Sequence, residues 1–175
     1  MSDTILQDVF GVAGNVWCVS ALTTSGGSAP SDSNAGTSWQ SPFATVHHAA
    51  SVAASGDLIL VGAGTFNEGN NCVNLASNVS LFGSGIYSTI VQSSYGNAAI
   101  VCPGTGSVVQ DMTIQATLTG NYAYPLGAVT SGGQLVASNC ICRRLRLQMA
   151  ARAARSYGRG DDRPARRREP AGLLG

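Results

Sequence analysis

This 175-residue chain contains no Lys at all and no Arg before Arg143, although six Asp and Glu side chains precede that position. All ten basic residues are Arg, and they occur between Arg143 and the C-terminus together with three acidic ones. The formal net charge of +1 is therefore the sum of −6 for the body of the chain, residues 1–142, and +7 for residues 143–175. A body without Lys disfavours a helical bundle, which is built largely from Ala, Leu, Glu and Lys.

Other absences narrow the class of protein further. No apolar run reaches the ~18 residues of a membrane-spanning helix, and the N-terminus lacks the basic and apolar segments of a secretory signal. We therefore expect neither a membrane span nor a signal peptide. No CxxC pair offers a zinc site, which leaves two interpretations of the cysteines, small apolar residues inside a β-structure or a disulfide framework. The five cysteines are Cys18, Cys72, Cys102, Cys140 and Cys142.

The body is rich in Gly, Ser, Thr, Asn, Ala and Val, which is typical of short strands joined by tight turns. A polar loop is expected at residues 21–40. Apolar runs bounded by turn-forming residues predict strands at 16–20, 58–61, 72–75, 79–82, 89–92, 98–102, 108–114 and 135–142.

One segment has helical periodicity instead. Residues 42–54 predict a helix with Ser41 as N-cap, Pro42 in the first helical position and Gly56 as terminator. We expect this helix to cover the open N-terminal end of the strands. Its apolar face consists of Phe43, Val46, Ala50 and Ala53.

An internal repeat indicates how the strands are organised. The segments 75–81, 108–114 and 141–147 align at equal intervals along the chain, with apolar side chains at the first, fifth and seventh positions. A repeat of strands and turns predicts an all-β protein, a β-solenoid in which each coil buries its inner face against its neighbours. A β-sandwich would also give short strands but would not require the repeat. Arg143 falls inside the third repeat, so the composition changes nearer Met149.

A series of motifs lies at 16–20, 32–39, 42–46, 56–61, 64–68 and 79–83. Their order along residues 14–115 resembles the opening of right-handed parallel β-helix proteins of the pectin-lyase-like superfamily. The resemblance implies a right-handed parallel β-helix with an N-terminal capping α-helix. The composition and the repeat then divide the chain into an extension at 1–13, the cap and first coils at 14–148, and an Arg-rich tail at 149–175 that is disordered or out of frame. The superfamily includes polysaccharide lyases, pectin esterases, phage tailspikes, adhesins and virion proteins.

Enzymes that resemble this fold use paired carboxylates, or bound Ca²⁺ with a basic residue that takes a proton. No Lys or Arg precedes Arg143, and no residues match the Asp, Asp and Arg set of the esterases. Asp57, Glu68 and Asp111 sit at turns or strand ends, where capping explains them. We therefore assign no catalytic residue.

Two other groups are candidates for binding a metal. Asp32 and Asn34 have the alternating oxygen ligands of the first half of a calcium loop, without the later carboxylate, and a solvated loop is the alternative. His47 and His48 are adjacent on the predicted helix, so their side chains point about 100° apart, which is poor geometry for one ion. Apart from the calcium candidate, no cofactor is expected.

Four tyrosines near turns are candidates for binding sugar. Their rings offer an apolar face for stacking on a sugar ring, although they would equally pack loops against the coils. They are Tyr87, Tyr95, Tyr122 and Tyr124.

The Arg-rich end has three interpretations: a frame change or truncation of the coding sequence, a basic arm for nucleic acid, or an ordinary disordered tail. We expect a non-enzymatic β-helix module of a virion or extracellular surface, with polysaccharide and further copies, as a homotrimer or virion assembly, as partners. One alternative is an N-terminal fragment of a carbohydrate-active enzyme whose catalytic coils lie beyond this chain. The other is a basic-tailed nucleic-acid binder.

Overall fold

The structure is a computed structural model that describes residues 14–96, 98–102, 105–118, 124–128 and 135–146. The predicted extension at 1–13, the Arg-rich tail at 149–175 and Tyr122 lie outside the described residues. The described part is mainly β with one short helix. In chain order its elements are β1 (Val16–Val19), α2 (Val46–Val52), β2 (Leu58–Val61), β3 (Gly64–Asn67), β4 (Val73–Asn74), β5 (Ser80–Phe82), β6 (Thr89–Ser93), β7 (Ala98–Cys102), β8 (Ser107–Leu118), β9 (Tyr124–Ala128) and β10 (Leu135–Arg146).

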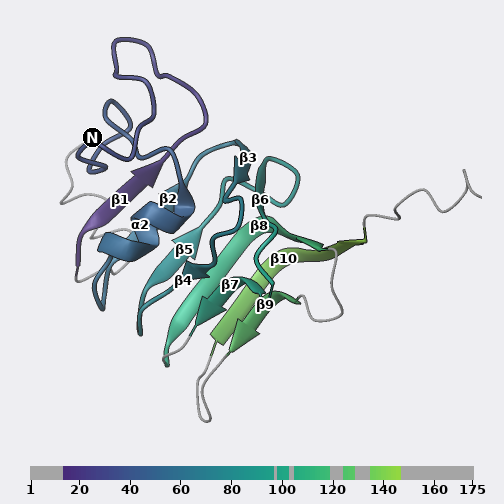
Figure 1. Cartoon of the computed structure of the whole chain (residues 1–175). Coiled ribbons are helices and arrows are strands. Elements are labelled where there is room, and N and C mark those ends of the chain that lie inside the picture. Colours follow the sequence, from purple (N-terminus) through teal and green to yellow (C-terminus); the bar gives the residue numbers. More distant parts are fainter. Residues whose placement is uncertain (1–13, 97, 103–104, 119–123, 129–134, 147–175) are drawn as a thin grey trace, which may run out of the picture.

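Every described pair of neighbouring strands is parallel. A seven-stranded sheet has the order β1-β2-β5-β8-β6-β3, with β10 beside β8, and a three-stranded sheet has the order β4-β7-β9 (Figure 1). The long strand β8 pairs with β5 through its first half and with β6 through its second half. The expected all-β architecture with parallel strands is therefore confirmed.

The register of the strands differs from the predicted repeat, which makes Val108 equivalent to Leu75 and Ile141. In the structure Val108 pairs instead with Ser80 on β5 and with Val136 on β10. The sequence intervals from Ser80 to Val108 and from Val108 to Val136 are both shorter than the predicted repeat. The interval from Leu58 on β2 to its partner Ser80 is shorter still. The predicted spacing is wrong because apolar alternation of period two fits several registers, and the lengths of the turns decide among them.

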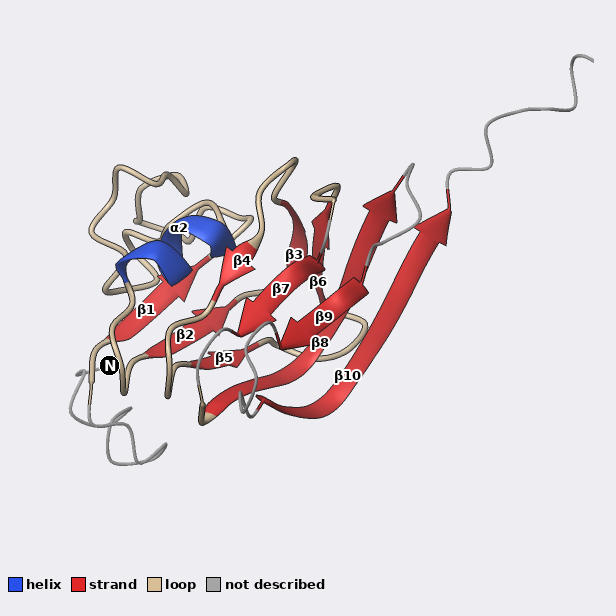
Figure 2. Cartoon of the chain, turned by 60° about the horizontal axis from the view of Figure 1, so that its bottom comes forward, coloured by secondary structure: helices blue, strands red, loops and turns tan. Residues whose placement is uncertain are grey.

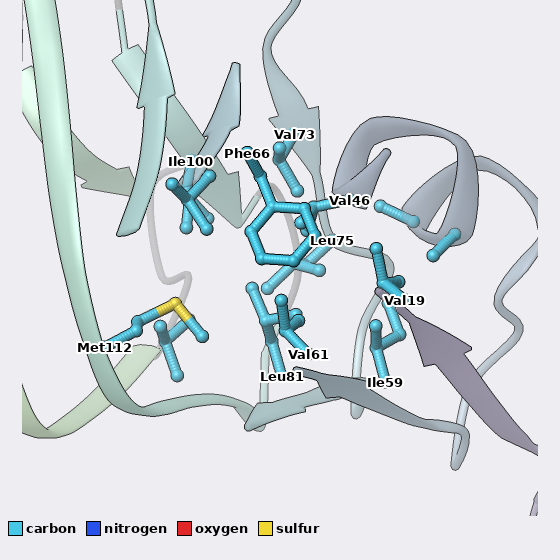
Figure 3. Close-up of a cluster of buried hydrophobic side chains, with 14 of the residues drawn as sticks. Val19, Val46, Ile59, Val61, Phe66, Val73, Leu75, Leu81, Ile100 and Met112 are labelled. Atoms are coloured by element: carbon cyan, nitrogen blue, oxygen red, sulfur yellow. The ribbon is translucent and has the colours of Figure 1, made fainter. Parts of the chain in front are cut away.

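The hydrophobic core lies between the two sheets and beneath α2 (Figure 3). Leu81 and Met112 enter it from the larger sheet, Ile100 from the smaller sheet and Val46 from the helix. All four side chains are fully buried. Burial of a side chain of this size stabilises the folded state by about 1.5–3 kcal/mol, so α2 and both sheets hold one another in place.

The helix starts later than the sequence pattern predicts. Phe43 is extended and bridges Val19, and its N–H donates to the Cys18 carbonyl oxygen at 2.9 Å. The N-cap is Thr45, not Ser41: its hydroxyl oxygen accepts a hydrogen bond from His48 N at 3.1 Å. The prediction of a helical start at Pro42 is wrong because pairing of Phe43 with β1 competes with the helix. Val46, Ala49 and Ala50 nevertheless face the core, as expected for a covering helix.

Asp57 forms the predicted turn cap. Its carboxylate accepts hydrogen bonds from Ala54 N at 2.8 Å, Asn15 N at 2.7 Å and Trp17 Nε1 at 2.9 Å. Burial alone would raise the pKa of this carboxyl, but the hydrogen bonds from Ala54, Trp17 and Asn15 outweigh it and lower the pKa. The three donors tie the start of β1 to the end of α2.

Candidate functional site

The outer face of the larger sheet carries an aligned row of polar side chains. Asn67 on β3 pairs with Gln92 on β6, Gln92 pairs with Gln115 on β8, and Gln115 pairs with Arg143 on β10. We call these four residues the amide row. Neighbouring strands lie about 4.8 Å apart, so the row presents one polar group at each such step across four strands.

The alternation of burial shows that the amide row faces away from the core. Phe66, Val91 and Ile114 precede the three amide residues along their strands, and all three are buried in the core. Successive side chains of a strand point to opposite faces, so Asn67, Gln92 and Gln115 are directed outward. Asn67 and Arg143 are exposed, whereas Gln92 and Gln115 are half-buried.

Two of the predicted tyrosines lie at opposite ends of the strand that carries Gln92. Tyr87 lies in the turn before β6 and is 79% exposed, whereas Tyr95 follows β6 and is 36% exposed. Tyr124, 61% exposed, begins β9 in the other sheet, where it pairs with Ala98. The structure therefore places Tyr87 and Tyr95 on the two segments that flank β6, and Tyr124 in the other sheet.

The turn that carries Tyr87 is fixed to the sheet. The Thr113 hydroxyl of β8 donates a hydrogen bond to the Ile86 carbonyl oxygen, and Ser84 N donates to the Thr89 hydroxyl oxygen at 2.9 Å. These bonds hold the turn beside β6 and β8, so Tyr87 is presented on a supported loop.

The four carboxylates of the described residues all accept hydrogen bonds. Asp32, Asp57 and Glu68 receive backbone N–H groups, and Asp111 receives side-chain amides. In the Asp111 carboxylate, Asn139 Nδ2 donates to one oxygen and Gln110 Nε2 donates to the other at 2.8 Å. The bond from Asn139, followed by that from Gln110, lowers the pKa of Asp111. Each of the four carboxylates thus stabilises a local turn, a helix start or a strand bend.

The calcium candidate is held by the protein's own donors. One Asp32 carboxylate oxygen accepts Ala44 N and Thr45 N, each at 3.0 Å, and the other accepts the Thr45 hydroxyl at 2.8 Å. The Asn34 amide donates to the Pro42 carbonyl oxygen at 2.8 Å. Asp32 and Asn34 therefore organise the loop before α2, and calcium binding there stays a prediction. Within the described ranges, no group of three His, Cys, Asp or Glu side chains is arranged for a metal ion.

The two histidines have separate environments. His47 Nδ1 lies 2.9 Å from the Cys72 carbonyl oxygen, whereas the His48 ring packs edge-on against Phe43 with a centroid distance of 4.7 Å. Each ring therefore contacts a different part of the fold, His47 the segment of Cys72 and His48 the residue that bridges β1.

The described cysteine side chains lie in three environments. Cys18 and Cys72 are buried, Cys140 is half-buried and Cys142 is exposed. Cys18 and Cys72 fit the interpretation as small buried residues. The side chain of Cys102 lies outside what the structure describes.

Sequence patterns identify the tyrosines but miss the amide row. The intervals from Asn67 to Gln92, from Gln92 to Gln115 and from Gln115 to Arg143 all differ in length, so no single period reveals the row. The available signal is local: an outward polar residue follows a core residue in Phe66-Asn67, Val91-Gln92 and Ile114-Gln115.

Comparison with known proteins supplies no family for the chain. No family model, curated protein or solved structure with which it was compared matches it. In the part of the chain that the structure describes, no helix is long and apolar enough to cross a membrane.

Proposed function

We propose that this chain is a right-handed parallel β-helix module of a virion or extracellular surface that binds polysaccharide without cleaving it. The observation that carries the proposal is the amide row, Asn67, Gln92, Gln115 and Arg143, aligned across four parallel strands. Its solenoid form is supported by the parallel pairing of strands from successive segments of the chain after β2, in both sheets.

The chemistry of the row suits sugar hydroxyls. A primary amide donates two hydrogen bonds and accepts two, so it matches a hydroxyl that both donates and accepts. Because the groups are fixed on sheet strands, a ligand orders few of them on binding, which reduces the entropic cost. An extended chain of sugars would meet these groups in succession.

The flanking rings add an apolar component. Tyr87 and Tyr95 are exposed at the two ends of β6, and an aromatic ring can cover the apolar face of a sugar while its hydroxyl remains hydrated. The supported turn at Ser84 and Ile86 favours a defined position for Tyr87.

The environment of the carboxylates supports binding without cleavage. Asp32, Asp57 and Glu68 are engaged with backbone N–H groups, and Asp111 with two side-chain amides. Glycoside hydrolysis requires two carboxyl groups that reach one glycosidic bond, about 5–9.5 Å apart. A role for these four in local structure leaves them poorly suited to that task.

The proposal is tested by measuring binding of the full chain to a panel of neutral and acidic polysaccharides. Gln92→Ala combined with Gln115→Ala should weaken binding by about tenfold or more, since each hydrogen bond contributes about 0.5–1.5 kcal/mol. Asn74→Ala is the matched control, because Asn74 is an exposed amide on β4 of the other sheet. Absence of binding to every polysaccharide, or equal loss in both variants, contradicts the proposal.

A further inference from the structure

The larger sheet has three terminal strands among the described ones, β1, β3 and β10, and the outer edges of β1 and β10 differ in what covers them. At the β1 end, Cys18 N donates to the Gly36 carbonyl oxygen at 2.7 Å, and Ser20 N donates to the Phe43 carbonyl oxygen at 3.0 Å. Residues 36–43 thus bond to the outer edge of β1, and α2 covers the adjacent core. The backbone groups of this edge are therefore already engaged by the chain itself.

The β10 end presents a row of backbone groups at its outer edge. β10 is 12 residues long, and it pairs with β8 from Leu135 to Ser138 and from Cys140 to Arg146, on either side of Asn139, which has a positive φ of 48°. Among the described strands only β8 pairs with it, and Figure 2 shows β10 as the outermost strand, at the end opposite β1 and α2. A long edge strand of this kind is a template for pairing with another chain.

Among the residues that the structure describes, the end of the core beside β10 is exposed. Ala137 pairs with Val109 and Cys142 pairs with Ile114, and both partners on β8 are fully buried core residues. Ala137 and Cys142 themselves are exposed. Their side chains occupy core-facing positions, so within the described ranges they form an exposed end of the hydrophobic core.

We propose that a second copy of this chain covers this end, with the two β10 strands antiparallel about a two-fold axis near Ile141. A two-fold contact joins the same surface of both copies and is closed, so it needs no second binding surface. The bonded edge of β1 disfavours the alternative, a head-to-tail stack. Antiparallel edges satisfy each other's N–H and C=O groups, and the two open core ends meet.

Charge complementarity supports this register. With the axis near Ile141, Arg143 of one copy lies opposite Asn139 of the other. Asn139 donates a hydrogen bond to the Asp111 carboxylate, which is on the neighbouring strand β8. Each Arg143 side chain is exposed and is thereby brought toward a carboxylate of the other copy. Both halves of the contact gain this attraction.

Sedimentation velocity of the full chain over a wide range of concentrations tests the proposal. A dimer is expected. Ala137→Lys should raise the dissociation constant by at least about tenfold, because it places a charge on the exposed end of each core, where contact with the other copy would bury it. Val136→Lys is the matched control: Val136 is the preceding residue, is 56% exposed and points to the other face of the strand. It should change the dissociation constant by less than about threefold.

Hydrogen exchange distinguishes a dimer from the alternative that other residues of the same chain cover the outer edge of β10. The β10 amides should exchange faster on dilution of the wild type and in Ala137→Lys at all concentrations. Circular dichroism establishes that Ala137→Lys is folded, and Cys142→Lys provides a second variant at the open end. The proposal would be overturned by a monomer with protected β10 amides, by a trimer or by an open-ended polymer. Equal effects of Val136→Lys and Ala137→Lys would overturn it as well.

Discussion

Glu68 and Val46 are joined by a hydrogen bond of 3.0 Å from the Val46 N–H to the buried Glu68 carboxylate. The other carboxylate oxygen of Glu68 accepts His47 N at 2.9 Å. One side chain at the end of β3 therefore satisfies two successive N–H groups at the start of α2. A single carboxylate fixes the helix against the sheet, and this link is the basis of two predictions.

Glu68→Ala should lower the free energy of unfolding by about 2–4 kcal/mol, because a buried donor without an acceptor costs about 1–3 kcal/mol. The N–H groups of Val46 and His47 both lose their acceptor. Urea unfolding monitored by circular dichroism measures the change. Thr65→Ala, at an exposed position on β3, is the control and should stay within about 0.5 kcal/mol of the wild type. Equal stability of the two variants would show that the Glu68 link is dispensable.

The pH dependence of stability should show the cost of burying this carboxylate. Burial raises the pKa of Glu68, and the hydrogen bonds from His47 and Val46 only partly oppose it. The folded protein thus holds the Glu68 proton more tightly than the unfolded chain. The corresponding stability is fully present below the unfolded pKa of about 4.3 and is lost as pH rises through the folded pKa.

Glu68→Gln isolates this effect, since Gln does not titrate and all other groups are common to both proteins. The free energy of unfolding of the wild type minus that of Glu68→Gln should fall between pH 4 and pH 7, as measured by urea unfolding. A difference that rises with pH would mean that the pKa of Glu68 is lowered in the folded state.

How far the sequence predicts the fold can be judged from individual strands. The patterns at 58–61 and 98–102 predict strands with the bounds that the structure shows, because a short apolar run between turn-forming residues leaves little choice. The same signals miss β3 and β9. Gly64–Asn67 contains one core side chain, and Tyr124–Ala128 contains Pro125 and Gly127, which count against a strand. Pairing with neighbouring strands overrides these weak local preferences.

The candidate site is less predictable than the strands. Exposed tyrosines are visible in a sequence, but the amide row depends on the register that places Gln92 beside Gln115. That register follows from the turns between the strands, whose lengths differ. The position of Phe43 shows the same limit, since its helical periodicity is overridden by pairing with Val19 on β1.

Gly36, whose carbonyl oxygen accepts a hydrogen bond from Cys18 N at the edge of β1, should tolerate no side chain. It has a positive φ of 71°, and a Cβ at this position would overlap the Phe43 ring. Phe43 has little freedom to move, since it stacks on Trp17 with a centroid distance of 5.7 Å and packs against His48. Gly36→Ala therefore combines backbone strain with overpacking.

Gly26→Ala provides the control for backbone strain. Gly26 has a φ of 75°, but a Cβ there would have no atom within 4 Å. It should cost about 1–2 kcal/mol, and Gly36→Ala should cost about 1–3 kcal/mol more. Thermal or urea unfolding measures both variants. If they are equally destabilised, Phe43 adjusts and the packing of the cap is not tight.

The cysteines should react with a thiol reagent in an order that the fold sets. Burial raises the pKa of Cys72 to about 11, and this thiol is covered, so it should resist maleimide labelling in the native protein at neutral pH. Cys142 is exposed and should be labelled first. Partial desolvation of its thiol and the nearby Cys140 raise its pKa as well. Peptide mapping by mass spectrometry of dilute protein gives the rate for each site.

The same labelling in urea is the control, since the rates of Cys72 and Cys142 should then converge. Similar native rates at these two sites would show that the core around Cys72 opens readily to solvent, which the burial of Val73 and Leu75 beside it argues against.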